Sequence, residues 1–332
     1  MRTIYFKNRP AIIGTCSIGG PKESMGDVKD FIDIRSDDDM FGETTFEKAE
    51  KRMLYTAIQG ALKSSGKSIK DVNAIIAGDL LDQIISATFS ARNFDTGYFG
   101  VYNACATFTE SLIIGSAFID GGYMENVICG TSSHFSSAER QYRYPLELGC
   151  TRPPQAQWTV TGAGVCVLGK GGGNGGEINV TGATFGKVVD FGVSDVNNMG
   201  AAMAPAAADT LVTHFKETGL SPSDYDLIVS GDLGTLGSRI LKDLTWEKGY
   251  DINKNHVDCG ELVYHIDESE YQGGSGAGCS SMVFCSYLIK RLKERKFRKI
   301  LLMATGALLS SLSSMQGESI PGIAHAVVIE TR

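Results

Sequence analysis

Hydrophobic positions along the chain alternate between two spacings, one typical of helices and one typical of buried strands. Residues 46–66 place apolar side chains three and four apart and end at Gly66, which predicts a helix with a glycine stop. The run VNAIIAG at 72–78 predicts a buried strand. The alternation continues with a helix at 80–94, a strand at 98–102, an almost wholly apolar helix at 104–122 and a strand at 126–133. This order predicts an α/β fold with parallel sheets covered by helices.

The second part of the chain repeats this order. Helices are predicted at 205–219, 236–249 and 278–296, and strands at 226–231 and 299–306. The stretch IIAGDL at 75–80 recurs as IVSGDL at 228–233. We therefore predict two pseudo-equivalent halves, residues 1–177 and 178–332, each with its most apolar helix at the centre. The glycine cluster GGGNGG at 171–176 lacks the GK[ST] of a phosphate loop and is predicted to be the tip of a hairpin.

Charge and cysteine content narrow the function classes. The net charge is −7, and the basic run at 290–299 fits a solvated helix end, so no nucleic-acid partner is expected. The first residues lack the apolar core of a secretory signal, and no window approaches the ~18 apolar residues of a membrane helix. We therefore expect no transmembrane segment and, at most, peripheral membrane association. The eight cysteines are scattered without a CxxC pair, which favours free thiols over disulfides or zinc.

Residues 103–112 read NACATFTESL, which places Cys105 in a turn of small residues before the apolar helix. A thiol at a helix N-terminus meets the positive end of the helix dipole, which favours the thiolate of a nucleophile. The same backbone N–H groups can bind an anion, and a cysteine can equally be a small core residue. The turn alone leaves these three interpretations open.

Three long stretches, at 46–80, 103–133 and 199–233, resemble the thiolase and ketoacyl-synthase superfamily. A narrower resemblance, to the stage V sporulation protein AD family of spore-forming bacteria, is carried by AERQYRYPLELG, PPQAQWTVTGAG, NNMGAAMAPAAADT, GGSGAGCS and ESIPGIAHAV. This resemblance implies a thiolase-like αβαβα layered fold and a role in moving dipicolinic acid into the developing spore. It implies a protein that is soluble or peripherally associated with the spore inner membrane, and that works with membrane proteins of the same uptake system. It also implies a homodimer, with residues 98–102 as the candidate edge strand.

The catalytic helpers of the superfamily are not found at the matching positions. A common form of the enzymes has a histidine where this chain has Gly231-Asp232-Leu233, and an asparagine where it has Gly274-Ser275-Gly276. The second cysteine of thiolases would fall in MATGAL at 303–308, which has none. An unassisted thiol is only a few per cent thiolate at neutral pH, and carboxylates at Asp79 and Asp232 would raise its pKa further. We therefore predict a binding protein that is not an enzyme and that uses no cofactor.

Two other functions remain open at this stage. One is an acyltransferase of the thiolase or ketoacyl-synthase type, with Cys105 as the nucleophile and His134 or a water as the base. The other is a structural scaffold for a membrane channel. No metal site is expected, because His256 and His265 have no metal-ligand spacing with each other or with the cysteines.

A pocket for dipicolinate, a flat aromatic dianion, needs local cations, N–H donors and an apolar slot. The N–H groups beside Asn103 and Cys105 could receive one carboxylate, and Ser275 belongs to the matching Gly-rich turn. The irregular stretch 134–159 supplies further candidates, which are His134, Arg140, Arg143, Arg152, Tyr142, Tyr144, Gln157 and Trp158. Arg140 is the favoured arginine, although any of the arginines could instead pair with Glu139 or Glu147.

Asp79 and Asp232 follow equivalent predicted strands, so a pseudo-twofold axis could bring both to one cleft. There they could bind the metal of a calcium–dipicolinate chelate, because calcium prefers oxygen ligands. The alternative is that each aspartate caps a helix, which we favour.

Overall fold

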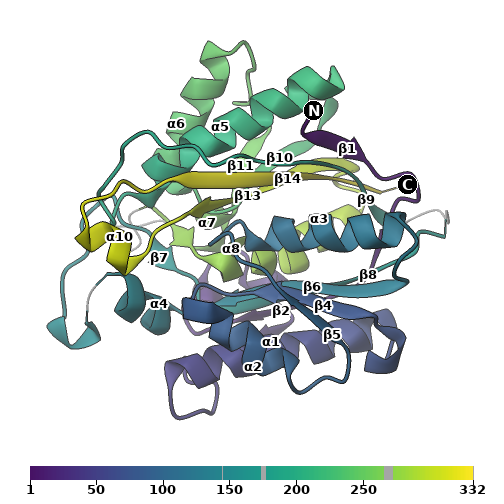
Figure 1. Cartoon of the computed structure of the whole chain (residues 1–332), viewed down its shortest axis with the longest axis horizontal. Coiled ribbons are helices and arrows are strands. Elements are labelled where there is room, and N and C mark those ends of the chain that lie inside the picture. Colours follow the sequence, from purple (N-terminus) through teal and green to yellow (C-terminus); the bar gives the residue numbers. More distant parts are fainter. Residues whose placement is uncertain (144, 173–176, 265–271, 332) are drawn as a thin grey trace.

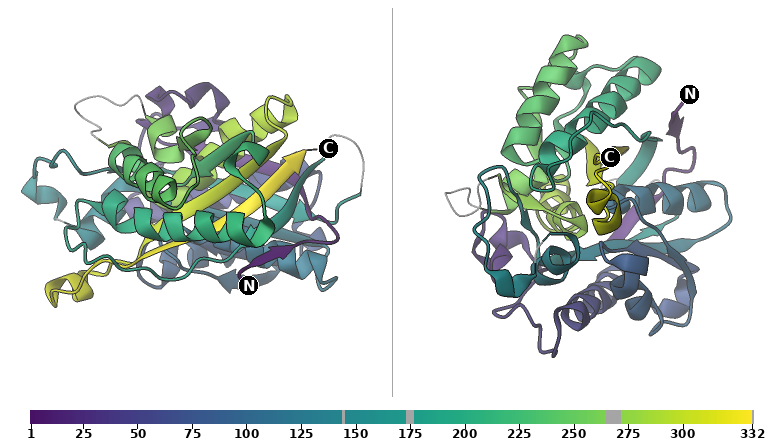
Figure 2. Two further views of the ribbon diagram at one scale, coloured as in Figure 1. Left: turned by 90° about the horizontal axis from the view of Figure 1, so that it is seen from above. Right: turned by 60° about the vertical axis from the view of Figure 1, so that its left-hand side comes forward.

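The computed structural model describes residues 1–143, 145–172, 177–264 and 272–331. Figure 1 and the right-hand view of Figure 2 show five layers, in which helices and sheets alternate. The lower outer layer holds α1 (Phe46–Ser65) and α2 (Ile85–Ala91), the middle layer α3 (Thr107–Asp120) and α8 (Ala277–Val283), and the upper outer layer α5 (Met199–Thr218) and α6 (Gly234–Glu247). The αβαβα arrangement expected from the sequence is therefore present.

The two sheet layers lie between these helices and join into one continuous strand order. Around the lower sheet the order is β2 (Ala11–Gly19), β8 (Gly162–Gly169), β6 (Asn126–Ser133), β4 (Ala74–Gly78) and β5 (Gly97–Gly100). The upper sheet runs β9 (Ile178–Thr184), β14 (Gly322–Thr331), β13 (Lys299–Ala307), β10 (Leu227–Ser230) and β11 (His256–Asp258). The sheets meet where Ala11 of β2 pairs with Asn179 of β9.

Parallel strands form one side of each sheet. In the lower sheet β4 pairs in parallel with β5 and β6, and in the upper sheet β10 pairs in parallel with β11 and β13. Ligand sites of open α/β sheets lie at the carboxyl ends of such strands. Short elements surround that end: α4 (Phe135–Tyr142), α7 (Cys259–Val263), α10 (Ser311–Met315), and the two-stranded sheet of β7 (Trp158–Thr159) and β12 (Gly274–Ser275).

The middle helix α3 is buried on almost every side because it lies between two sheets. Its buried side chains include Phe108, Leu112, Ile113 and Ile119, which pack with α8 and both sheets. The outer helix α1 instead buries one stripe and begins at the N-cap Thr45. Gly66 ends α1 with φ of 68°, in the left-handed region that favours glycine.

Two sequence predictions about elements are wrong in detail. The predicted hairpin at 171–176 is not one, since β2 lies between β8 and β9 in the strand order. The glycine cluster thus lies on a link between the two sheets, and residues 173–176 themselves lie outside the described residues. Helix α5 begins at Met199 instead of 205 and carries Pro205 inside it. Its N-cap is Asn198, whose side chain accepts from the Ala201 N–H at 3.4 Å.

Candidate functional site

Cys105 lies in a tight turn that precedes α3 at the carboxyl end of β13. The residue before it, Ala104, has φ of 50°, which is unusual for a residue with a side chain. Gly306 at the end of β13 permits the turn to approach, because a Cβ there would lie 2.3 Å from the Asn103 carbonyl oxygen. The backbone of both strand and turn therefore fixes where the sulfur points.

The polar groups around the Cys105 sulfur are a carboxylate, a hydroxyl and a backbone N–H, from Asp232, Ser275 and Gly276. Asp232 is fully buried and accepts from Ser275 Oγ at 3.0 Å, from the Gly276 N–H at 2.9 Å and from Thr305 Oγ1 at 2.7 Å. Burial raises the pKa of the Cys105 thiol well above its usual range, and the Asp232 carboxylate raises it further. The sulfur is therefore held as a thiol. Of the two aspartates predicted to raise its pKa, Asp232 does so, whereas Asp79 is not among the groups that act on it.

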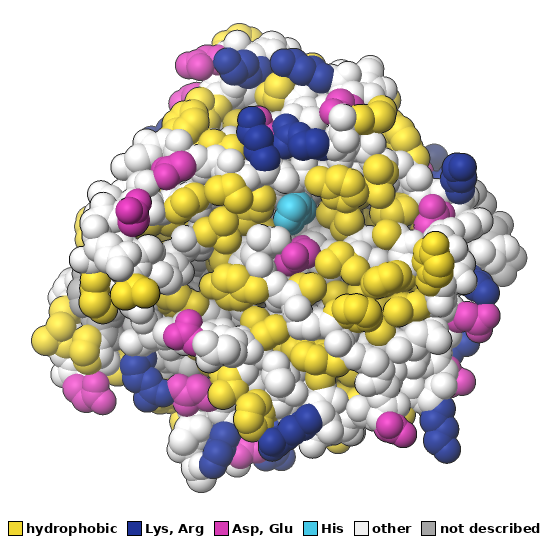
Figure 3. All heavy atoms as spheres, viewed as in Figure 1, with side chains coloured by type: hydrophobic (Ala, Val, Ile, Leu, Met, Phe, Trp, Pro, Cys, Tyr) yellow, Lys and Arg dark blue, Asp and Glu magenta, His cyan; other side chains and the backbone are white. Residues whose placement is uncertain are grey.

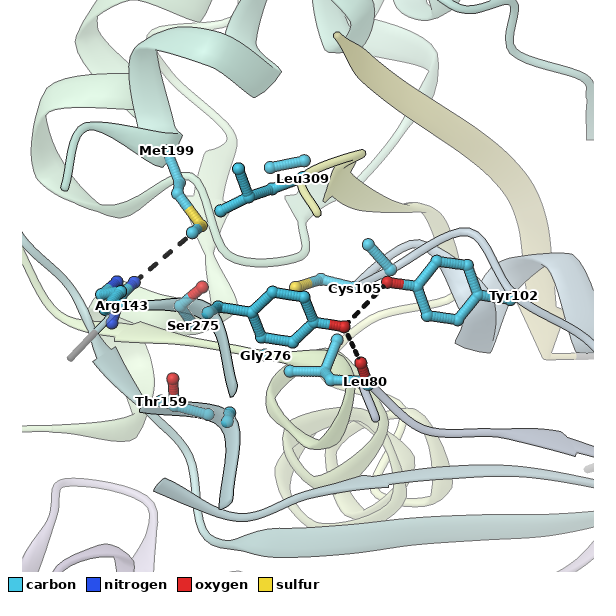
Figure 4. Close-up of a pocket in the computed structure, with 13 residues that line it drawn as sticks. Leu80, Tyr102, Cys105, Arg143, Thr159, Met199, Ser275, Gly276 and Leu309 are labelled. Atoms are coloured by element: carbon cyan, nitrogen blue, oxygen red, sulfur yellow. Dashed lines mark hydrogen bonds between the residues drawn. The ribbon is translucent and has the colours of Figure 1, made fainter. Parts of the chain in front are cut away.

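A small pocket of about 40 Å³ opens in front of this sulfur. Figure 4 shows Cys105 with Ser275 and Gly276 on one side, and Tyr102 and Leu80 on the other. The wall is mostly apolar and carries one cation, Arg143. The full lining is Leu80, Tyr102, Ala104, Cys105, Ala138, Tyr142, Arg143, Thr159, Met199, Ser275, Gly276, Ala307 and Leu309.

Four of the candidates offered by the sequence, Cys105, Tyr142, Arg143 and Ser275, line this pocket. Gln157 lies behind it, where its amide Nε2 donates to the Asp232 carbonyl at 2.7 Å and to the Gly274 carbonyl at 2.8 Å. Gln157 therefore positions the two segments that carry Asp232 and Ser275, and does not form the wall.

The prediction that Arg140 faces the pocket is wrong. Arg140 is half exposed and pairs with Glu47 of α1. Ala138 and Tyr142, which do line the pocket, are four residues apart and share one face of α4, whereas Arg140 lies two residues from each and points away. The helical spacing of residues 135–142 was the sequence signal that could have excluded Arg140 from the pocket wall.

The arginine that reaches the pocket is Arg143, whose side chain is only 5% exposed. Its Nη1 donates to Glu139 Oε2 at 2.8 Å, and Arg152 Nη1 donates to the same oxygen at 3.0 Å. The alternative of pairing with Glu139 thus holds for both arginines. Tyr144, another candidate of this stretch, lies outside the described residues.

His134 does not line the pocket either. Its Nδ1 accepts from the Ser136 N–H at 3.1 Å as the N-cap of α4, and its Nε2 lies 2.8 Å from the Asp39 carbonyl oxygen. These two contacts assign the ring proton to Nε2, because the Asp39 carbonyl can only accept. Both nitrogens are occupied, and burial lowers the pKa of His134, so the imidazole is a structural cap.

Asp79 and Asp232 have separate sets of hydrogen-bond donors. Asp79 accepts from the Leu81 N–H at 2.8 Å and from the Ala87 N–H, in the first turn of α2, at 2.7 Å. It therefore satisfies a donor at the start of a helix, although the N-cap residue of α2 is Ile84. The helix-cap interpretation is wrong for Asp232, since the N–H groups that open α6, those of Leu233 and Gly234, donate to Asp258.

Asn103 contacts a histidine, although not one that the sequence pointed to as a partner. Its Nδ2 atom lies 3.3 Å from Nε2 of His325 on β14, and the amide also hydrogen-bonds Glu110 of α3. His325 Nδ1 accepts from the Gly186 N–H at 3.0 Å, which leaves the ring proton on Nε2. This amide–imidazole pair turns toward Glu110 and β14, and is not among the polar groups around the Cys105 sulfur.

Comparison with known proteins assigns the family. Residues 1–330 match the family described as stage V sporulation protein AD (SpoVAD). The chain is also 42% identical over 329 residues to stage V sporulation protein AD of Bacillus subtilis (strain 168), covering 99% of this chain and 96% of that protein. The chain belongs to the SpoVAD family.

Solved structures show that this SpoVAD family member has the thiolase-like fold that the sequence predicted. OleA of Xanthomonas campestris with bound cerulenin superposes with a TM-score of 0.64 at 13% identity, over 98% of this chain and all of the other. The 3-oxoacyl-[acyl-carrier-protein] synthase III of Aquifex aeolicus gives 0.58 at 16% identity, over 97% and 99%. At such low identity the likeness concerns the fold alone.

Three further properties of this SpoVAD family member bear on the site. Within the described ranges, no helix combines the length and the apolar character needed to cross a bilayer. No group of three or more histidine, cysteine, aspartate or glutamate side chains in that part of the chain is placed to hold a metal ion. The eight cysteines are free thiols, as predicted, and only Cys150 is exposed.

Proposed function

We propose that the chain is a non-catalytic receptor of thiolase-like fold that binds dipicolinic acid and supports its uptake into the developing spore. The observation that carries the proposal is a largely buried arginine, Arg143, in the wall of the pocket. Arg143 shares Glu139 with Arg152, and the Asp195 carboxylate also interacts with Arg143. A cation in an otherwise apolar pocket wall favours an anionic ligand.

The geometry of Arg143 supports the same ligand class. Its Nε is buried and has no hydrogen-bond partner among the residues of known placement, so one donor of the guanidinium fork is unused. A planar fork suits a carboxylate because it can bind both oxygens. The leucine, alanine and methionine side chains of the wall suit the flat ring, and Thr159 and Ser275 supply polar groups.

Calorimetry with the purified chain and dipicolinate, with and without calcium, tests this function. We expect saturable binding, and a loss of affinity of roughly 10- to 100-fold in Arg143→Gln, the range for a lost hydrogen bond to a charged group. Glu139 keeps its pair with Arg152 in this variant, so the fold is expected to survive. Arg140→Gln is the matched control, since Arg140 pairs with Glu47 outside the pocket.

Absence of saturable heat for the unmodified chain under both conditions would contradict the proposal. Equal affinities of the unmodified chain and Arg143→Gln would contradict the assigned role of Arg143 alone.

Acyl transfer by Cys105 is the second candidate, favoured by the position of Cys105 in the pocket wall. The neighbouring Asp232 argues against it, because a carboxylate disfavours the thiolate that attacks. Intact mass after incubation with acyl-CoA donors separates the two functions. A stoichiometric gain in mass that Cys105→Ser abolishes would support the enzyme; an unchanged mass supports the receptor.

In the cell we propose that this chain acts in the developing spore, in peripheral contact with membrane proteins of the same uptake system. The family membership supports this setting. The test is complementation of a Bacillus subtilis strain that lacks its own SpoVAD. We expect the chain to restore the dipicolinate content of the spores and Arg143→Gln to fail, at equal protein level; equal restoration by both would count against the pocket.

We also propose a homodimer formed through β5. This strand ends the sheet, with β4 as its one neighbour among the described strands. Phe99 of β5 is 43% exposed and packs on Phe118 of α3, with ring centroids 5.5 Å apart. In the view of Figure 1, β5 and α3 lie in front, and Figure 3 shows hydrophobic side chains gathered over the middle of this face. An exposed apolar edge strand favours pairing with a second copy.

A further inference from the structure

Two cavities lie side by side at the carboxyl ends of the strands and share part of their walls. The inner one is the pocket of about 40 Å³ that contains Cys105 and Arg143. The outer one has a volume of about 370 Å³ and is lined on its far side by Leu81, Asp82, Gln83, Ile84, Leu308 and Ser310. Tyr102, Tyr142 and Leu309 line both cavities, so they form the partition between them.

The partition is closed by a chain of hydrogen bonds between the two tyrosines. Tyr142 OH donates to the Leu80 carbonyl oxygen, and the two phenolic oxygens lie 3.2 Å apart. Because the Tyr142 hydroxyl already donates its proton to the Leu80 carbonyl oxygen, the Tyr102 hydroxyl is the donor to Tyr142. Figure 4 shows Tyr102 beside Cys105, with the hydrogen bond of its phenol drawn as a dashed line. The bridge thus links the segment before α3 with the last residue of α4.

The inner pocket is too small for an organic ligand while this bridge stands. A volume of about 40 Å³ accommodates water, whereas pockets for drug-sized ligands occupy roughly 300–1,000 Å³. The outer cavity alone falls within that range, but neither Cys105 nor Arg143 belongs to its wall. A ligand that enters from the outer cavity must therefore separate the tyrosines and join the two cavities to reach Arg143.

We propose that Tyr102 and Tyr142 form a gate between the outer cavity and the Cys105 pocket, through which an aromatic carboxylate passes to Arg143. Opening breaks the bond between the phenols and leaves the Tyr102 hydroxyl free to donate to the carboxylate that enters. Tyr102 is 42% exposed, so its ring can turn toward solvent without unpacking the core. The identity of the ligand rests on the proposed function; the gate itself does not.

Access to the Cys105 thiol measures the gate without any ligand. The background is Cys150→Ser, which removes the exposed cysteine, and peptide mass spectrometry follows alkylation of Cys105 by iodoacetamide. We expect Tyr102→Phe and Tyr142→Phe to raise the rate about 2- to 10-fold, the effect of one lost neutral hydrogen bond on the closed state. Tyr123→Phe is the matched control, because Tyr123 is exposed at the end of α3 and lines neither cavity.

The pH profile separates gating from activation of the thiol. Opening the gate multiplies the rate at every pH and leaves the apparent pKa of Cys105 unchanged, whereas activation would shift that pKa. The gate would be overturned if Tyr102→Phe and Tyr142→Phe react at the same rate as the Tyr123→Phe control. It would also be overturned if a lower pKa of Cys105 accounts for the whole increase in rate. Alkylation tests the gate and calorimetry tests dipicolinate binding. The alkylation result therefore decides for or against the gate even if the chain binds no dipicolinate.

Discussion

The carboxylate of Asp232 decides the chemistry at the level of single residues. It lies against the Cys105 sulfur and is itself held by Ser275, Gly276 and Thr305. Burial disfavours both charged forms, and two negative charges at this spacing disfavour each other. The turn before α3 therefore presents a protonated sulfur to the pocket. A protonated thiol can form part of a pocket wall but is a poor nucleophile.

Removing this charge is expected to activate the thiol. Asp232→Asn keeps the shape of the side chain and an oxygen for Ser275 and Gly276, while Thr305 can turn its hydroxyl to accept from the new amide. We expect the pKa of Cys105 to fall, and its alkylation by iodoacetamide to reach half its maximal rate at a lower pH. Asp82→Asn, which removes a charge from the outer cavity, is expected to leave the profile unchanged. Identical profiles for Asp232→Asn and the unmodified chain would refute the assignment.

Which arginine faces the pocket, Arg140 or Arg143, also depends on single residues. Both lie in one short basic stretch, and composition does not distinguish them. Arg140 lies within α4 and points away from the pocket, whereas Arg143 follows its last turn, with φ of −124° and ψ of −78°, and turns inward. The sequence identified the stretch and the need for a cation, but the direction of each side chain depends on where the helix ends.

At the scale of elements, a buried pair of carboxyl groups joins α1, β4, β6 and α4. Glu50 of α1 accepts from Ser132 at 3.1 Å and Ser137 at 3.1 Å, and its charge interacts with that of Asp79. Burial raises the pKa of Asp79 to about 6, and burial together with the Asp79 charge raises the pKa of Glu50 well above its usual range. The folded chain therefore retains protons here that the unfolded chain releases.

This pair predicts a pH dependence of stability with a definite sign. The folded pKa of each group lies above its unfolded value, so the stabilisation is complete below about pH 4 and is lost as the pH rises. For Asp79 the loss runs from about pH 4 to about 6. Buried histidines oppose this contribution, because burial lowers the pKa of His214 and of His325 to about 4, so the pair is read from a difference between variants. In urea unfolding we expect Glu50→Gln to gain stability relative to the unmodified chain as the pH rises through this window. Glu247→Gln, at an exposed position, is the control, and an unchanged slope in Glu50→Gln would contradict the prediction.

Sequence patterns located most elements because each pattern reports local burial. The apolar run that became α3 was assigned to the centre, where it lies between two sheets. The link at 171–176 was assigned wrongly because strand patterns do not reveal which strands pair. The helix was predicted to start at Pro205, but α5 begins at Met199 and contains this proline. Proline has no backbone N–H, so the helix loses one hydrogen bond there.

At the scale of the whole molecule, the open edge of β5 predicts the oligomeric state. Sedimentation of the purified chain is expected to give twice the chain mass, and Phe99→Asp is expected to give monomers, because a charge on the edge strand opposes pairing with a second copy. Phe191→Asp is the matched control, since Phe191 is also exposed but lies away from β5. A monomeric unmodified chain, or a dimeric Phe99→Asp variant, would exclude this interface.

The sequence by itself determined the α/β alternation, the central apolar helix, the turn that carries Cys105 and the resemblance to a family, because these are properties of local stretches. Only the tertiary structure decided what surrounds the sulfur. Ser275 and Arg143 reach the Cys105 pocket, and Asp232 reaches the sulfur, from segments far apart in the chain. Two tyrosines forty residues apart separate this pocket from the outer cavity. Such meetings depend on side-chain direction and on the packing of distant strands, which hydrophobic spacing along the chain does not encode.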